Sequence, residues 1–191
     1  MVPIPRCDTE AMAHFNDLSF YDYSQGSPRG TKNVGWPQFG RAFETVQPSE
    51  ETLELLWSFC NVAVMQTCGI HRCDLCVPPR AVSAIRGNAK LPLGSAEIRV
   101  LSKEGFSPLP QRLRNEESSG LLLLRKSAVP FSVYAAPNLV YHYVDAHHYK
   151  PPDEFLDALR EGPRPPDEKY FQCLKELDLE WGTTASLTLG E

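Results

Sequence analysis

Apolar residues recur at steps of three and four over residues 49–66, which is the period of one face of a helix. Ser49 suits the N-cap, and the acids at Glu50 and Glu51 favour the positive end of a helix. The sequence therefore predicts a core-facing helix over 49–66. Its apolar stripe consists of Leu53, Leu56, Trp57, Cys60 and Val64.

Three later segments open with proline, which is tolerated in the first turn of a helix because its missing N–H would be unpaired there. The first predicts a helix over 137–147. The next two begin at 151–154 and 165–168, where two prolines precede an aspartate and a glutamate. Gly162 ends the earlier of these two helices.

Alternation of apolar and polar residues over 95–101 predicts a half-buried strand, with Glu97 and Arg99 on its exposed side. Two more short strands are expected over 120–125 and 131–135. Together these elements predict an α+β fold that is rich in loops, with a small antiparallel sheet and about four helices, stabilised by zinc.

A chain of 191 residues is sufficient for one domain, so 1–191 is treated as a single domain. Residues 1–48 carry aromatic residues but little periodicity, which indicates a loop-rich arm. Residues 102–119 are polar and indicate an exposed loop. Residues 182–191 are expected to fray as a C-terminal tail.

The net charge of −5 argues against a general nucleic-acid binder, which usually has a basic face. The N-terminal sequence does not resemble a signal peptide, and no apolar run is long enough to cross a membrane. These features lead us to expect a cytoplasmic protein. In a reducing compartment the six cysteines are better explained as free thiols or metal ligands than as disulfides.

Residues 68–76 contain a cluster of metal-ligand types. Cys73 and Cys76 have the Cys-x2-Cys spacing that brings two sulfurs to one zinc ion in a tight turn. Cys68 and His71 repeat this spacing just upstream. The two pairs are too close in sequence to serve the same ion, so Cys68 and His71 are the weaker candidates.

The histidines that would complete the site lie at the end of the predicted helix over 137–147. His142 and His147 have a spacing used by two-histidine zinc sites. On a regular helix they would stand roughly 140° apart, so the last turn must tighten or unwind. We predict that Cys73, Cys76, His142 and His147 bind one Zn²⁺, with His148 as an alternative fourth ligand.

The order Cys-x2-Cys, helix, His-x4-His resembles the Cys2His2 zinc-finger layout at these four residues. Residues 77–141 separate Cys76 from His142, whereas about 12 residues do so in a standard finger, so the resemblance does not imply DNA reading. Thiols without a metal, a disulfide and another metal remain alternatives.

The chain also resembles a group of uncharacterised bacterial proteins. The matching residues lie at 34–36, 73–76, 96–100 and 134–155. This resemblance implies that the cysteines and histidines belong to one site, and it implies no activity.

A closed site of four protein ligands favours a structural role, whereas a catalytic zinc keeps a position open for water. Were one ligand absent, Asp74, Asp145 or Glu97 would be the nearest candidate bases. A redox pair is disfavoured because prolines at 78 and 79 would make a helix that starts at Cys73 very short. The motifs of zinc deaminases, metalloproteases, nucleotide-binding proteins and serine hydrolases are missing from the sequence.

Three classes of function follow. We favour a non-enzymatic, zinc-stabilised binding protein (an adaptor, inhibitor or immunity-type protein) whose partner is another protein. The acidic balance of the chain favours a basic partner. The binding surface could be the 102–119 loop or the aromatic residues at 20–23. The first alternative is a metal-dependent hydrolase or nuclease with an open zinc site. The second is a nucleic-acid-binding protein that uses Arg80, Arg86, Lys90 and Arg99.

Overall fold

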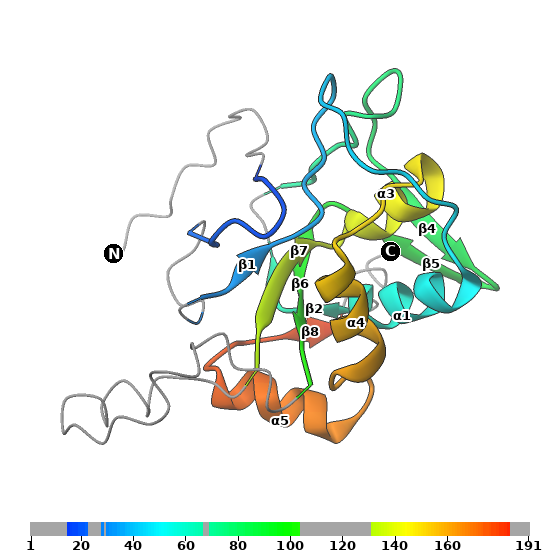
Figure 1. Ribbon diagram of the computed structural model, residues 1–191. Helices are drawn as coiled ribbons and strands as arrows, with labels where there is room; N and C mark the ends of the chain where they lie inside the picture. The colour runs from blue at the N-terminus through cyan, green and yellow to red at the C-terminus, as the bar shows by residue number, and fades with distance from the viewer. Residues whose placement is uncertain (1–14, 23–27, 29, 67–68, 104–130, 184–191) are drawn as a thin grey trace, which may run out of the picture.

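The computed structural model describes residues 15–22, 28, 30–66, 69–103 and 131–183. Within these residues, helices combine with three small sheets, so the predicted α+β class is confirmed (Figure 1). The helices are α1 (Glu50–Cys60), α3 (Val140–His147), α4 (Asp153–Glu161) and α5 (Glu168–Glu176).

The central sheet has the strand order β1-β7-β6-β3. Its strands are β1 (Lys32–Asn33), β3 (Met65–Gln66), β6 (Ala96–Leu101) and β7 (Val133–Pro137). The β6 strand pairs antiparallel with both neighbours, but β1 runs parallel to β7. The sheet is therefore mixed, and not antiparallel throughout as the sequence predicts.

Two smaller pairs of strands lie beside this sheet. The first joins β2 (Val62–Ala63) to β8 (Gly182–Thr183), and the second is the hairpin of β4 (Ser83–Arg86) and β5 (Ala89–Pro92). The tail expected over 182–191 thus begins with a paired strand, and residues 184–191 lie outside the described residues.

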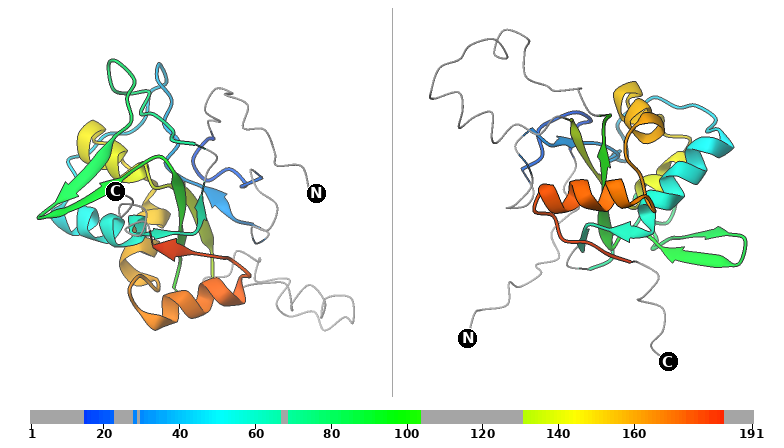
Figure 2. Two further views of the ribbon diagram at one scale, coloured as in Figure 1. Left: turned by 180° about the vertical axis from the view of Figure 1, so that it is seen from behind. Right: turned by 90° about the horizontal axis from the view of Figure 1, so that it is seen from below.

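The core lies between β6 and the helices. Both α1 and α4 pack against β6, and α3 packs against α1. Two views show α5 lying across the end of β6 and β7 (Figures 1 and 2). There the Tyr170 ring contacts Phe59 edge-on at 5.4 Å, and its hydroxyl donates to the carbonyl of Arg99 at 2.8 Å.

Two helix boundaries differ from the prediction. Ser49 caps α1 as expected, because its Oγ accepts from the N–H of Thr52 at 3.1 Å. The helix ends at Cys60, however, since the chain turns at Asn61 into β2 and β3. The later helix begins at Val140 and not at Pro137, because Pro137 still belongs to β7.

The prediction that β6 is half-buried is wrong, because Glu97 and Arg99 are both 0% exposed. Arg99 Nη1 donates to Glu97 Oε2 at 2.7 Å. The hydroxyl of Tyr21 donates to the same oxygen at 2.9 Å, and the guanidinium lies 4.9 Å from the centre of the Tyr21 ring. Pairing allows both charges to be buried on the face where solvent was expected.

Some predictions fall on undescribed residues. The strand over 120–125 and most of the 102–119 loop lie outside the described residues, as does Tyr23. The described part of the 1–48 arm contains β1 and two isolated bridges, Phe20 to Lys32 and Thr45 to Tyr149. Among the described helices, none is long and apolar enough to span a bilayer.

Candidate metal centre

Four side chains converge on one point between the 69–82 loop and α3. The ligand atoms of Cys73, Cys76, His142 and His147 all lie within 4.8 Å of one another. Cys73 Sγ is 3.3 Å from His147 Nε2, and Cys76 Sγ is 3.3 Å from His142 Nε2 and 3.6 Å from His147 Nε2. A tetrahedral zinc ion with ordinary bond lengths separates sulfur and nitrogen ligands by about 3.5 Å. The structure thus brings together the four residues that the sequence singled out.

The two thiols are positioned by a tight backbone turn. Cys73 N–H donates to the carbonyl of Arg80 at 2.9 Å, which closes the loop behind the cysteines. Within the loop, the backbone N–H groups of Cys76 and Leu75 point at Cys73 Sγ. Such N–H donors stabilise a thiolate, and this arrangement suits a metal-bound sulfur.

The loop is anchored to the fold through Gly94. His71 N–H donates to the carbonyl of Gly94 at 2.7 Å, and Gly94 N–H donates to Asn138 Oδ1 at 2.7 Å. Asn138 is fully buried between β7 and α3. One buried side chain therefore connects the segment before the cysteines to the helix that carries the histidines.

The end of α3 is wider than a regular helical turn. The N–H groups of His148 and Tyr149 both donate to the carbonyl of Tyr143, five and six residues back. His148 itself is left-handed, with φ of 56°. These bonds end the regular helix at His147, and the His142 and His147 rings lie with their centres 5.0 Å apart. The expected departure from a regular last turn is present.

Burial shifts the pKa values of two side chains in this site, Cys73 and His142. It raises the pKa of the Cys73 thiol to about 11. It lowers the pKa of His142 to about 4, with further contributions from His147 and Arg80. The imidazole is therefore neutral at pH 7, which is the form that binds metals. A cation at the centre would stabilise the thiolate form of Cys73, because opposite charge favours ionisation.

The remaining candidates lie elsewhere. His148 is exposed at the left-handed position and is not among the converging ligands. His71 is half-buried and also outside that group, while Cys68 lies outside the described residues. Two further described cysteines, Cys60 and Cys173, are buried and separate from the site.

The three candidate bases are not arranged around an open metal position. Glu97 is held by Arg99 and Tyr21, Asp145 is exposed on α3, and Asp74 is half-buried beside Cys73. Because the four converging donors already satisfy a tetrahedral ion, the arrangement suits a structural metal.

The proposed nucleic-acid residues do not form one basic face. Arg99 is buried with Glu97, and Arg86 is paired with Glu50 and Glu54 on α1. Arg80 and Lys90 are exposed. Sequence reasoning missed Gly94 and Asn138, which position the ligands. Their role depends on contacts between distant segments, and no local spacing indicates it.

Comparison with known proteins gives a family without a described activity. No curated protein and no solved structure matches the chain. A family model does match, over residues 13–111 and 113–160, and these residues include all four converging ligands. The chain therefore belongs to the family described as Domain of unknown function (DUF7919).

Proposed function

We propose that this chain is a non-enzymatic binding protein in which a structural zinc ion joins the 69–82 loop to α3 and shapes a docking surface for another protein. The observation that carries this proposal is the convergence of two sulfurs and two imidazole nitrogens at tetrahedral separations. Zinc is favoured because tetrahedral sites of two sulfur and two nitrogen ligands select it over hard cations.

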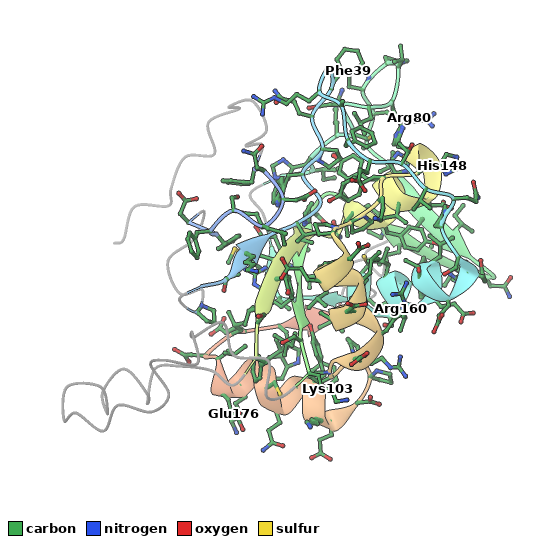
Figure 3. The ribbon with its side chains drawn as sticks, viewed as in Figure 1. Phe39, Arg80, Lys103, His148, Arg160 and Glu176 are labelled. Atoms are coloured by element: carbon green, nitrogen blue, oxygen red, sulfur yellow. The ribbon has the colours of Figure 1, made fainter. Side chains whose placement is uncertain are left out.

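The metal-held loop exposes apolar side chains. Val77, directly after the ligand Cys76, is 86% exposed, and Ile70 is 63% exposed. Phe39, which is 66% exposed, and Arg80 lie at the same end of the molecule (Figure 3). Exposed apolar residues that are held on a rigid loop are typical of a protein-binding surface.

The charges on this loop favour a particular kind of partner. Arg72 and Arg80 are exposed on it, although the whole chain has a net charge of −5. We therefore propose a partner surface that combines apolar and acidic groups, in place of the basic partner that net charge alone favours. Metal binding would fix the loop before the partner arrives, which reduces the entropy lost on association.

The test compares two variants that each place a charge on an exposed apolar residue. Val77→Asp lies on the metal-held loop, whereas the matched control Ile85→Asp lies on β4 and is 70% exposed in the native protein. The tagged proteins are used to capture partners from the source organism. The proposal predicts a stoichiometric partner with the native chain and with Ile85→Asp, at least about tenfold less of it with Val77→Asp, and equal zinc content in all three.

Equal capture by both variants, or no stoichiometric partner, would contradict the docking surface. A zinc ion with a bound water in place of one of the four ligands would contradict the structural role and favour the hydrolase alternative.

A further inference from the structure

A small pocket lies beside the end of α3, apart from the four candidate metal ligands. It has a volume of about 110 Å³. Pockets for drug-sized ligands are about 300–1,000 Å³, so this one suits a single chemical group. Its walls include four aromatic residues, Phe15, Trp36, Phe43 and Tyr149, together with the carboxylate of Asp17 and the exposed Arg41.

The walls are held by contacts between three distant segments. Thr45 forms a bridge with Tyr149, and Val46 N–H donates to the carbonyl of His148 at 2.8 Å. Asp17 Oδ2 accepts from the hydroxyl of Tyr149 at 2.6 Å, and its Oδ1 accepts from Gly35 N–H at 2.9 Å. Because these contacts exist in the structure as it stands, the pocket is preformed.

The aromatic rings form two edge-to-face pairs. Phe15 and Trp36 have ring centres 5.3 Å apart, and those of Phe43 and Tyr149 are 5.9 Å apart. Trp36 and Tyr149 are almost fully buried, at 7% and 2% exposed. The negative faces of aromatic rings attract cations, and Trp and Tyr do so most strongly.

We propose that this pocket binds a methylated ammonium group. The aromatic walls and the Asp17 carboxylate attract such a cation, and the opposing charge of Arg41 is screened because that side chain is exposed to solvent. A primary ammonium gives up three hydrogen bonds to water on entry, and the Asp17 oxygens, which already accept from Gly35 and Tyr149, replace them only in part. A quaternary ammonium donates none, so it can use the charge of Asp17 and the ring faces without replacing those bonds.

The test uses choline and its neutral carbon isostere, 3,3-dimethylbutan-1-ol, which have the same shape and differ in charge. Binding to the full chain is followed by NMR through the Trp36 indole N–H signal. Choline is expected to shift this signal saturably and to bind at least about tenfold more tightly than the isostere. Equal binding of the two compounds, or no saturable shift with choline, would overturn the proposal.

Two variants locate the binding. Asp17→Asn keeps the size of the side chain and can keep hydrogen bonds to Gly35 and Tyr149, but it removes the charge. Phe43→Leu removes one ring. Each is expected to weaken choline binding about tenfold, while the control Asp153→Asn, at an exposed carboxylate on α4, leaves it unchanged. Unchanged binding in both pocket variants, with melting temperatures like that of the native protein, would contradict the assignment.

A methylated ammonium can come from a small molecule such as choline or from a methylated lysine of another protein, and a final comparison distinguishes these two sources. Peptides carrying trimethyllysine or unmodified lysine are titrated beside free choline. Tighter binding of the trimethyllysine peptide than of choline identifies a modified protein as the source, and tighter binding of choline identifies a small molecule. Tighter binding of the unmodified lysine peptide than of both would overturn the preference for methylated groups.

Discussion

At the scale of single residues, the four candidate ligand side chains differ in how much a bound metal would change their protonation. The Cys73 thiol has its pKa raised to about 11 by burial, although two backbone N–H groups point at its sulfur. The pKa of His142 is lowered to about 4 by burial, so its neutral form needs no metal. The Cys73 thiol therefore gains more from a bound cation than His142 does.

Replacement of Cys76 by serine is expected to abolish stoichiometric metal binding and to lower the melting temperature by roughly 5–15 °C, since lost metal affinity is lost folding free energy. Cys173→Ser is the matched control, because Cys173 is also buried but lies on α5, away from the ligands. Metal content and thermal melting are measured on both. Loss of metal from the control as well, or retention in Cys76→Ser, would contradict the assigned site.

The stability of the metal-free protein is expected to fall as pH drops from about 6.5 to 4. The pKa of His142 is lowered in the folded state. Between pH 6.5 and 4, its imidazole is therefore protonated in the unfolded chain but still neutral in the folded chain. Its contribution to stability is complete above 6.5 and is lost as pH falls towards 4. Urea unfolding in the presence of a chelator measures this slope, which should be smaller in His142→Gln. An identical slope in the variant would show that His142 does not contribute.

At the scale of elements, the placement of the 69–82 loop depends on Gly94. Its φ is +88°, and a Cβ there would overlap the carbonyl of His71, which leads into the cysteine turn. Gly94→Ala should therefore cost roughly 2–4 kcal/mol and weaken metal binding. The control is Gly87→Ala in the β4–β5 hairpin, where φ is +56° and a Cβ meets no atom within 4 Å.

In the control, only backbone strain of about 1 kcal/mol is expected, and metal affinity should stay native. Chemical denaturation measures the free energy of unfolding, and competition with a metal-binding dye measures the metal affinity. Equal effects of the two substitutions would show that the contact between Gly94 and His71 does not position the loop.

The sequence predicts elements well where the signal is local. Ser49 and the glutamates after it mark the start of α1, and the prolines before 153 and 168 mark the starts of α4 and α5. It fails where tertiary pairing decides. Residues 61–66 continue the apolar period of α1, yet they pair as β2 and β3 with strands distant in sequence.

The same distinction holds for the candidate site. The ligand types and their spacings are local, so Cys73, Cys76, His142 and His147 could be selected from the sequence. Their convergence depends on Asn138, which receives a hydrogen bond from Gly94 across 44 positions of the chain. The burial of Glu97 and Arg99 could not be predicted from the sequence, because it depends on contacts with Tyr21 from a distant segment.

At the scale of the whole molecule, the central sheet holds a buried ion pair between Arg99 and Glu97 of β6. Arg99→Met would leave Glu97 charged and buried without its partner, at a cost of about 3–5 kcal/mol. Arg86→Met removes an arginine that pairs with glutamates whose side chains are 66% and 72% exposed, and should cost less than about 1 kcal/mol. Urea unfolding compares the two variants. A small effect for Arg99→Met would show that the buried pair is not needed for the fold.

The proposed metal centre and the aromatic pocket both lie at the C-terminal end of α3. His147 is a candidate ligand, and Tyr149, two residues later, lines the pocket. Figures 1 and 2 show the 36–43 and 69–82 loops rising at the same end of the molecule. A metal that fixes His147 would therefore also hold the backbone that supports the pocket and the docking surface.

The most direct measurement is zinc K-edge X-ray absorption on the purified native chain, together with its metal content. We predict one zinc per chain, with two sulfur neighbours at about 2.3 Å and two nitrogen neighbours at about 2.0–2.1 Å. Chains that contain no stoichiometric metal, or a zinc ion without two sulfur neighbours, would contradict the account.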